Sequence, residues 1–175
     1  MKVYTKKGGF TLVELLIVIS IIGVLTAAAA TTVSVVMKTS TTAMEQNREL
    51  GEVHMAGSWI SRDMKKARSG HDFVQTTAGS TLCSMQCYVG EGFITENVTY
   101  LIDIGERSLK RRSQPGDGSA PATTITIARL IAGPGLTTTW FSKITDNYYN
   151  LTVTADYNGS IPGSVTRIYK MKQGY

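Results

Sequence analysis

The chain has 175 residues, of which 42% are hydrophobic and 18% charged, and its formal net charge is +5. This length allows one domain with a substantial core, and the composition excludes a disordered chain and a multi-pass membrane protein. Because Lys2, Lys6 and Lys7 all precede residue 10, the positive charge is weak evidence for a nucleic-acid partner.

A long apolar segment follows these lysines. Between Lys7 and Lys38 the only charged residue is Glu14. A helix over residues 10–30 would be roughly 32 Å long, enough to cross a hydrocarbon core of about 30 Å. Since the lysines precede the segment, we expect a cytoplasmic N-terminus and an exported C-terminal part.

Three interpretations of this segment compete. One is a secretory signal that is cut among the alanines at residues 27–30, and another is an uncleaved anchor. The third gives Glu14 a role. A carboxylate in a membrane helix costs on the order of 2.5–3.5 kcal/mol on insertion scales, so such residues are usually functional and paired. A signal peptide or a plain anchor has no need of this residue, which favours the third interpretation.

The stretch KKGGFTLVELLIVISIIGVL resembles the leader of type IV pilins and type II secretion pseudopilins. The resemblance implies that residues 1–9 are a leader, that prepilin peptidase cuts after Gly9, and that the new N-terminal residue, Phe10, is methylated. It also implies that Glu14 pairs with the N-terminal amine of a neighbouring subunit, and a buried charge requires such a partner. Many major pilins have a helix-bending proline where this chain has Thr31 and Thr32, so its absence favours minor pilins and pseudopilins.

The helical pattern is expected to continue over residues 31–69 as an amphipathic helix. The residues of its apolar stripe recur at spacings of three and four: Val53, Ala56, Ile60, Met64 and Ala67. The turn residues Ser69 and Gly70 are expected to end it. Residues 31–42 are rich in Thr and Ser, which are poor helix formers, so a flexible linker is the alternative there.

Residues 70–175 are expected to form an exported β-rich head. Strands are predicted over residues 98–104, 108–113, 123–131, 151–157 and 164–171, with turns at 115–118, 133–135 and 158–159. A long helix followed by strands predicts an α+β fold in which the helix packs on an antiparallel sheet, as in pilins. WISRDMKKA, VTYLID, LKRR, ITIARLI and TRIYKMK resemble segments of J-type minor pseudopilins and related minor pilins.

Two cysteines, Cys83 and Cys87, are candidates for chemistry in the head. In an exported domain we expect a disulfide, which would close a local loop and contribute roughly 2 kcal/mol. A redox centre is the alternative. Zinc would need two more ligands, and His54 and His71 lack metal spacing, so no metal or other cofactor is expected.

The densest positive cluster in the sequence contains Arg107, Lys110, Arg111 and Arg112. A solvated hairpin is the favoured interpretation of this cluster, and contact with DNA is the alternative. The sequence has no nucleophile–base–acid set, phosphate loop or paired-carboxylate motif, which predicts a protein that is not an enzyme.

The pattern as a whole predicts a minor structural subunit of a type IV pilus, a competence pilus or a type II secretion pseudopilus. The expected partners are prepilin peptidase, other pilin or pseudopilin subunits, the membrane and the inner-membrane assembly machinery. We expect a single-pass cytoplasmic membrane protein that enters a surface or periplasmic filament. A membrane-attached or secreted β-rich binding module with an ordinary signal or anchor is the alternative.

Overall fold

The computed structural model describes residues 9–67, 81–89, 95–132, 139–145, 147–157 and 164–174. The chain divides into two compact units, Met1–Met44 and Glu45–Tyr175. The described residues form one helix, α1 (Leu12–Lys66), and the strands β1 (Thr81–Tyr88), β2 (Thr95–Asp103), β3 (Ser108–Pro115), β4 (Thr123–Ala128), β5 (Trp140–Thr145), β6 (Tyr148–Ala155) and β7 (Val165–Lys172).

The segment rich in Thr and Ser, residues 31–42, is helical. Its hydroxyl groups bond back to the preceding turn: Thr39 Oγ1 donates to the Val35 carbonyl at 2.9 Å, and Thr42 Oγ1 donates to the Lys38 carbonyl at 3.0 Å. These bonds satisfy the hydroxyl groups inside the helix. Residues 31–42 therefore form a helix, as expected, and not the flexible linker that was the alternative.

The C-terminal part of the chain supports the end of α1. The helix ends at Lys66, and the predicted stop at residues 69–70 lies outside the described residues. Gly174 N–H donates to the Met64 carbonyl at 3.0 Å, which satisfies one of the last helical acceptors. A Cβ at position 174 would collide with the Lys65 carbonyl oxygen, so this close approach requires glycine.

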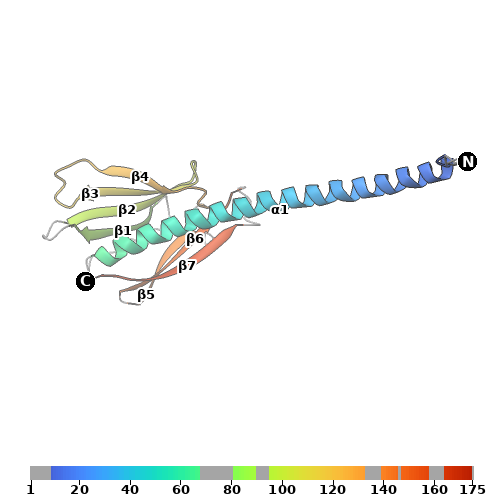
Figure 1. Cartoon of the computed structure of the whole chain (residues 1–175). Helices are drawn as coiled ribbons and strands as arrows, with labels where there is room; N and C mark the ends of the chain where they lie inside the picture. The colour runs from blue at the N-terminus through green and yellow to red at the C-terminus, as the bar shows by residue number, and fades with distance from the viewer. Residues whose placement is uncertain are drawn as a thin grey trace, which may run out of the picture. The chain divides into compact units, whose positions relative to one another are not determined.

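The described strands form two antiparallel sheets, with the orders β1-β2-β3-β4 and β5-β6-β7. An isolated bridge between Ile131, which follows β4, and Ala155, at the end of β6, joins them. Figure 1 shows the part of α1 that belongs to the second unit running beside both sheets. The predicted α+β architecture, a long N-terminal helix followed by antiparallel β-structure, is confirmed, but the described strands of the head form two sheets where one was expected.

The predicted strands correspond to β2, β3, β4, β6 and β7, whereas β1 and β5 were not predicted. β4 is shorter than the predicted strand over residues 123–131. It ends at Ala128 because Arg129 N–H donates to the Glu52 carboxylate at 2.6 Å and Leu130 adopts a φ of 59°. The predicted turns at residues 133–135 and 158–159 lie outside the described residues.

The core of the second unit lies where α1 faces the two sheets. The predicted apolar stripe of the helix is buried, and each of its members is at most 1% exposed: Val53, Ala56, Ile60, Met64 and Ala67. The sheets contribute, among others, Val98, Tyr100, Ile102, Leu109, Leu151 and Val153. Burial of these side chains is the main force that holds the helix to the sheets.

Two glycines of α1 provide a matched test of this packing. A Cβ at Gly57 would overlap the ring of Tyr169, whose hydroxyl donates to the Val53 carbonyl at 3.1 Å, whereas a Cβ at Gly51 would meet nothing within 4 Å. We expect Gly57→Ala to lower the free energy of unfolding by about 1–3 kcal/mol. Gly51→Ala should raise it by about 0.5–1 kcal/mol, because alanine is the better helix former. Denaturant titration of the full chain in detergent micelles, followed by tryptophan fluorescence, measures both changes; a stabilised Gly57→Ala would contradict the packing.

Candidate functional site

The N-terminus of α1 contains a reciprocal set of hydrogen bonds between Thr11 and Glu14. Thr11 N–H and Thr11 Oγ1 both donate to Glu14 Oε2 at 2.9 Å, and Glu14 N–H donates to Thr11 Oγ1 at 3.3 Å. This is a capping box, in which two helix-end N–H groups are satisfied by side chains. The T-x-x-E spacing in the sequence is the signal for this box, and sequence reasoning missed it.

The capping box gives Glu14 a role within its own chain. A negative charge in the first turn also interacts favourably with the helix dipole. The carboxylate is nevertheless exposed, and its two bonds from Thr11 both reach the same oxygen, Oε2. Glu14 can therefore cap α1 and still present its other oxygen, Oε1, to a cation. Gly9 and Phe10 precede the box and are also exposed.

The first unit presents an apolar surface to its surroundings. Every described residue from Gly9 to Met44 is exposed, including large side chains such as Phe10 and Leu12. α1 contains an 18-residue window that is long and apolar enough to cross a membrane, and none of it is buried. Apolar surface of this extent requires a membrane or other protein surfaces to cover it.

The second unit contains a buried polar cluster centred on Asp63 of α1. Arg111 Nε of β3 and Tyr100 OH of β2 each donate to Asp63 Oδ2 at 2.6 Å. Arg111 also donates to Glu96 Oε2 at 3.2 Å. The Asp63 side chain is 4% exposed and that of Arg111 is 11% exposed. Burial, together with the Asp63 carboxylate, raises the pKa of Tyr100 far above its usual range, so its hydroxyl remains a donor.

The four basic residues of the predicted cluster do not form one positive surface. Lys110 and Arg112 lie on one face of β3, and Arg111 lies on the other, because side chains alternate along a strand. Lys110 pairs at 2.8 Å with both Asp103 and Glu106, and Arg111 pairs with Asp63 and Glu96. Arg107 lies 3.9 Å from Asp156. Of the four, only Arg112 is exposed without an ion pair to a described residue, so this geometry does not support the DNA-contact interpretation.

The predicted disulfide between Cys83 and Cys87 is wrong for this fold. Both thiols are free and buried. They lie on β1, opposite Tyr100 and Glu96 of β2, so the segment is extended. Four residues of extended strand separate the two Cα atoms by about 13 Å, and a disulfide requires less than about 7 Å. The sequence spacing suggested a loop, but the segment is a strand.

The two thiols should be unreactive in the folded protein. Burial, with a smaller contribution from the Asp63 carboxylate, raises the pKa of Cys87 to about 12, and burial also raises that of Cys83. The reactive thiolate would then be about 10⁻⁴ of Cys87 at pH 8. We expect no modification by iodoacetamide at pH 8 in native protein and two adducts in denaturant without reductant, both measured by intact mass. A mass that lacks two hydrogens, or no adducts after denaturation, would indicate a disulfide.

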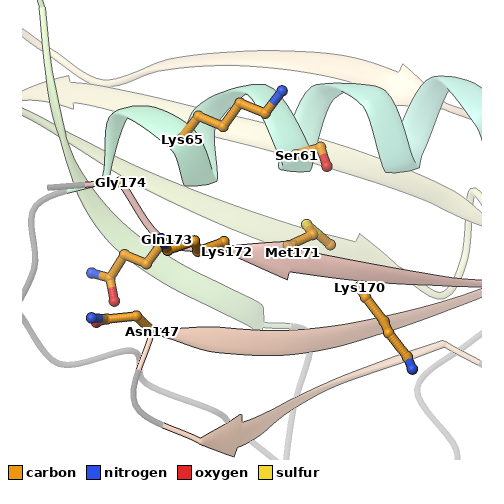
Figure 2. A pocket seen from close by; sticks show the side chains of 8 residues that line it. All are labelled: Ser61, Lys65, Asn147, Lys170, Met171, Lys172, Gln173 and Gly174. Carbon is orange, nitrogen blue, oxygen red and sulfur yellow. The ribbon is translucent and has the colours of Figure 1, made fainter.

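A pocket of about 720 Å³ lies where the last turns of α1 meet the end of β7 (Figure 2). Its lining includes Ser61 and Lys65 of α1 and residues 170–172 of β7. The side chains in Figure 2 do not converge on one point, since Lys170 points away from the helix that carries Lys65. The described residues contain no group of three or more His, Cys, Asp or Glu side chains that could hold a metal ion.

Comparison with known proteins gives one result, and it concerns the N-terminal segment. Residues 4–30 match the family model of the prokaryotic N-terminal methylation motif. Neither the comparison with curated proteins nor the comparison with solved structures gave a match. The matched residues include Gly9, Phe10, the Thr11–Glu14 capping box and the exposed apolar start of α1.

Proposed function

Because the chain carries the N-terminal methylation motif and the α+β architecture of the type IV pilin-like family, we propose that it is a minor structural subunit of a pilin-type filament. In this proposal prepilin peptidase cuts between Gly9 and Phe10, the new N-terminus is methylated, and the exposed apolar part of α1 packs against other subunits. The observation that carries the proposal is the motif itself, with a single carboxylate, Glu14, at the start of an apolar helix.

The chemistry of the N-terminus supports an assembly role. Before incorporation, the exposed apolar surface of the first unit would be covered by the membrane, with the head exported. In a filament the same surface would be covered by the helices of neighbouring subunits. The cut creates an α-amine at Phe10, and the Glu14 carboxylate of a neighbour would neutralise it in surroundings where an unpaired charge is costly.

Three settings share this assembly chemistry: a type IV pilus, a competence pilus and a type II secretion pseudopilus. The loose resemblance of the head strands to J-type minor pseudopilins favours a minor subunit. Partners in each setting would be other pilin or pseudopilin subunits and the inner-membrane assembly machinery. The pilin-type family is structural, so we assign no catalytic residues and no cofactor.

The first experiment is an intact-mass and N-terminal sequence determination on the protein from membranes of cells with and without prepilin peptidase. We expect a chain that begins at methylated Phe10 only when the peptidase is present. A chain that begins near residue 31, independently of the peptidase, would overturn the proposal and indicate a secreted β-rich binding module.

A further inference from the structure

β7 is an edge strand, since among the described strands it pairs only with β6. In an antiparallel pair, successive residues direct their main-chain groups alternately toward the partner strand and away from it. Just past β7, Gln173 N–H donates to the Asn147 carbonyl on the β6 side at 2.8 Å, whereas Gly174 N–H turns to the Met64 carbonyl of α1. By this alternation, the even-numbered residues of β7 direct their main-chain groups away from β6. We call this row of groups the β7 edge.

The pocket in Figure 2 lies along the C-terminal half of the β7 edge. Its lining comprises Ser61 and Lys65 of α1, residues 170–174 at the end of β7, and Asn147 on the β6 side. A neighbouring strand lies about 4.8 Å from the strand with which it pairs. The pocket therefore offers space for a short extended segment beside β7, before Gly174 closes the edge against α1.

The surface around the β7 edge is basic. The following residues of the last turn of α1 and the C-terminal half of β7 are exposed, and none forms an ion pair with another described residue: Lys65, Lys66, Lys170 and Lys172. The one acidic residue in the last turns of α1, Asp63, is buried against Arg111. Residues 164–174 contain no acidic residue. No carboxylate from these segments neutralises this charge.

The charge and the main-chain groups of the β7 edge indicate what kind of molecule could bind there. Positive side chains on an edge strand repel an identical strand, so a second copy of β7 is disfavoured. Free main-chain groups on a strand edge bind an extended peptide, and cross-strand pairs with Lys170 and Lys172 would favour carboxylates on that peptide. We propose that the β7 edge binds an extended acidic segment of another polypeptide, which adds a strand to the β5-β6-β7 sheet.

A pair of peptides with equal charge tests this proposal on the full chain in detergent micelles. The probe is fluorescently labelled Thr-Glu-Val-Glu-Val-Glu-Thr, which we call the valine peptide. Its control is the same peptide with N-methylated glutamates, which keeps the charge but removes the N–H donors opposite Lys170 and Lys172. We expect the valine peptide to bind more tightly than the control by about tenfold or more in fluorescence anisotropy at low salt. We also expect it to slow hydrogen exchange at the amides of Lys170 and Lys172.

Two variants with the same change of charge complete the test. Lys170→Glu combined with Lys172→Glu should weaken binding of the valine peptide by about tenfold or more. Arg112→Glu combined with Arg129→Glu, both exposed and outside the pocket, should change it by less than about threefold. Equal binding of the two peptides, equal effects of the two double variants, or unchanged exchange in β7 would each overturn the proposal. Tighter binding of duplex DNA than of the valine peptide would overturn it as well, because phosphates use the charges and not the strand edge.

Discussion

Replacing Arg111 by methionine is expected to lower the free energy of unfolding by about 3–5 kcal/mol. The substitution removes the cation that lies 2.6 Å from Asp63 and leaves a carboxylate that is 4% exposed. Tyr100 would still donate to Asp63, but one neutral hydrogen bond does not offset the desolvation of a charge. Denaturant titration of the full chain in detergent micelles, followed by tryptophan fluorescence, measures the loss.

The adjacent residue supplies the control for this prediction. Arg112 points to the other face of β3 and is exposed, so Arg112→Met should change stability by no more than about 0.5 kcal/mol. The double variant Asp63→Asn, Arg111→Met removes both charges, and we expect it to be more stable than Arg111→Met alone. If Arg111→Met and Arg112→Met had equal effects, the Asp63 cluster would not stabilise the head.

The difference between Arg111 and Arg112 also shows why the prediction of one basic cluster was wrong. Adjacent basic residues suggested one positive surface, but the two-residue period of a strand places Arg111 and Arg112 on opposite faces. Asp63 follows Ile60 by three residues and precedes Ala67 by four, so it belongs to the buried stripe of α1. A charged residue on an apolar stripe predicts a buried partner of opposite charge, and that combination could have been recognised from the sequence.

β1 was predictable on the same principle. Cys83, Met85 and Cys87 alternate with Ser84 and Gln86, which is the pattern of a strand with one buried face. The strand was not predicted because the two cysteines were interpreted as a disulfide that closes a local loop. The apolar N-terminal segment, the stripe of α1 and the α+β class were predictable because each depends on a long periodic pattern.

The division of the head into two sheets was not predictable from local patterns. It depends on where β4 stops, and that is set by contacts between segments far apart in the sequence. Glu52 of α1 accepts a hydrogen bond from Arg129 N–H, and Ile131 then bridges to Ala155. The positive φ of Leu130 in this region carries no clear sequence signal, since leucine rarely adopts it.

The second large effect is expected at Glu14. Glu14→Ala should insert into the membrane normally, because removal of a charge favours insertion, and residues 1–9 should still be cut. Incorporation into filaments should fall by roughly tenfold or more, since the α-amine of a neighbouring subunit would lack its partner. The measurement is the ratio of filament-associated to membrane-associated protein, with each chain expressed at the same level.

The capping box requires two further variants, because Glu14→Ala also removes a helix cap. Glu14→Gln retains an acceptor for Thr11 N–H and removes the charge, whereas Thr11→Ala disrupts the box and retains the charge. If the charge governs assembly, Glu14→Gln should be as defective in filament incorporation as Glu14→Ala. Thr11→Ala should enter filaments nearly as well as the wild-type chain. If instead Glu14→Gln enters filaments normally and Thr11→Ala does not, Glu14 acts only as a helix cap. A neutral side chain can cap a helix, but only a charged one can neutralise an amine inside an apolar bundle.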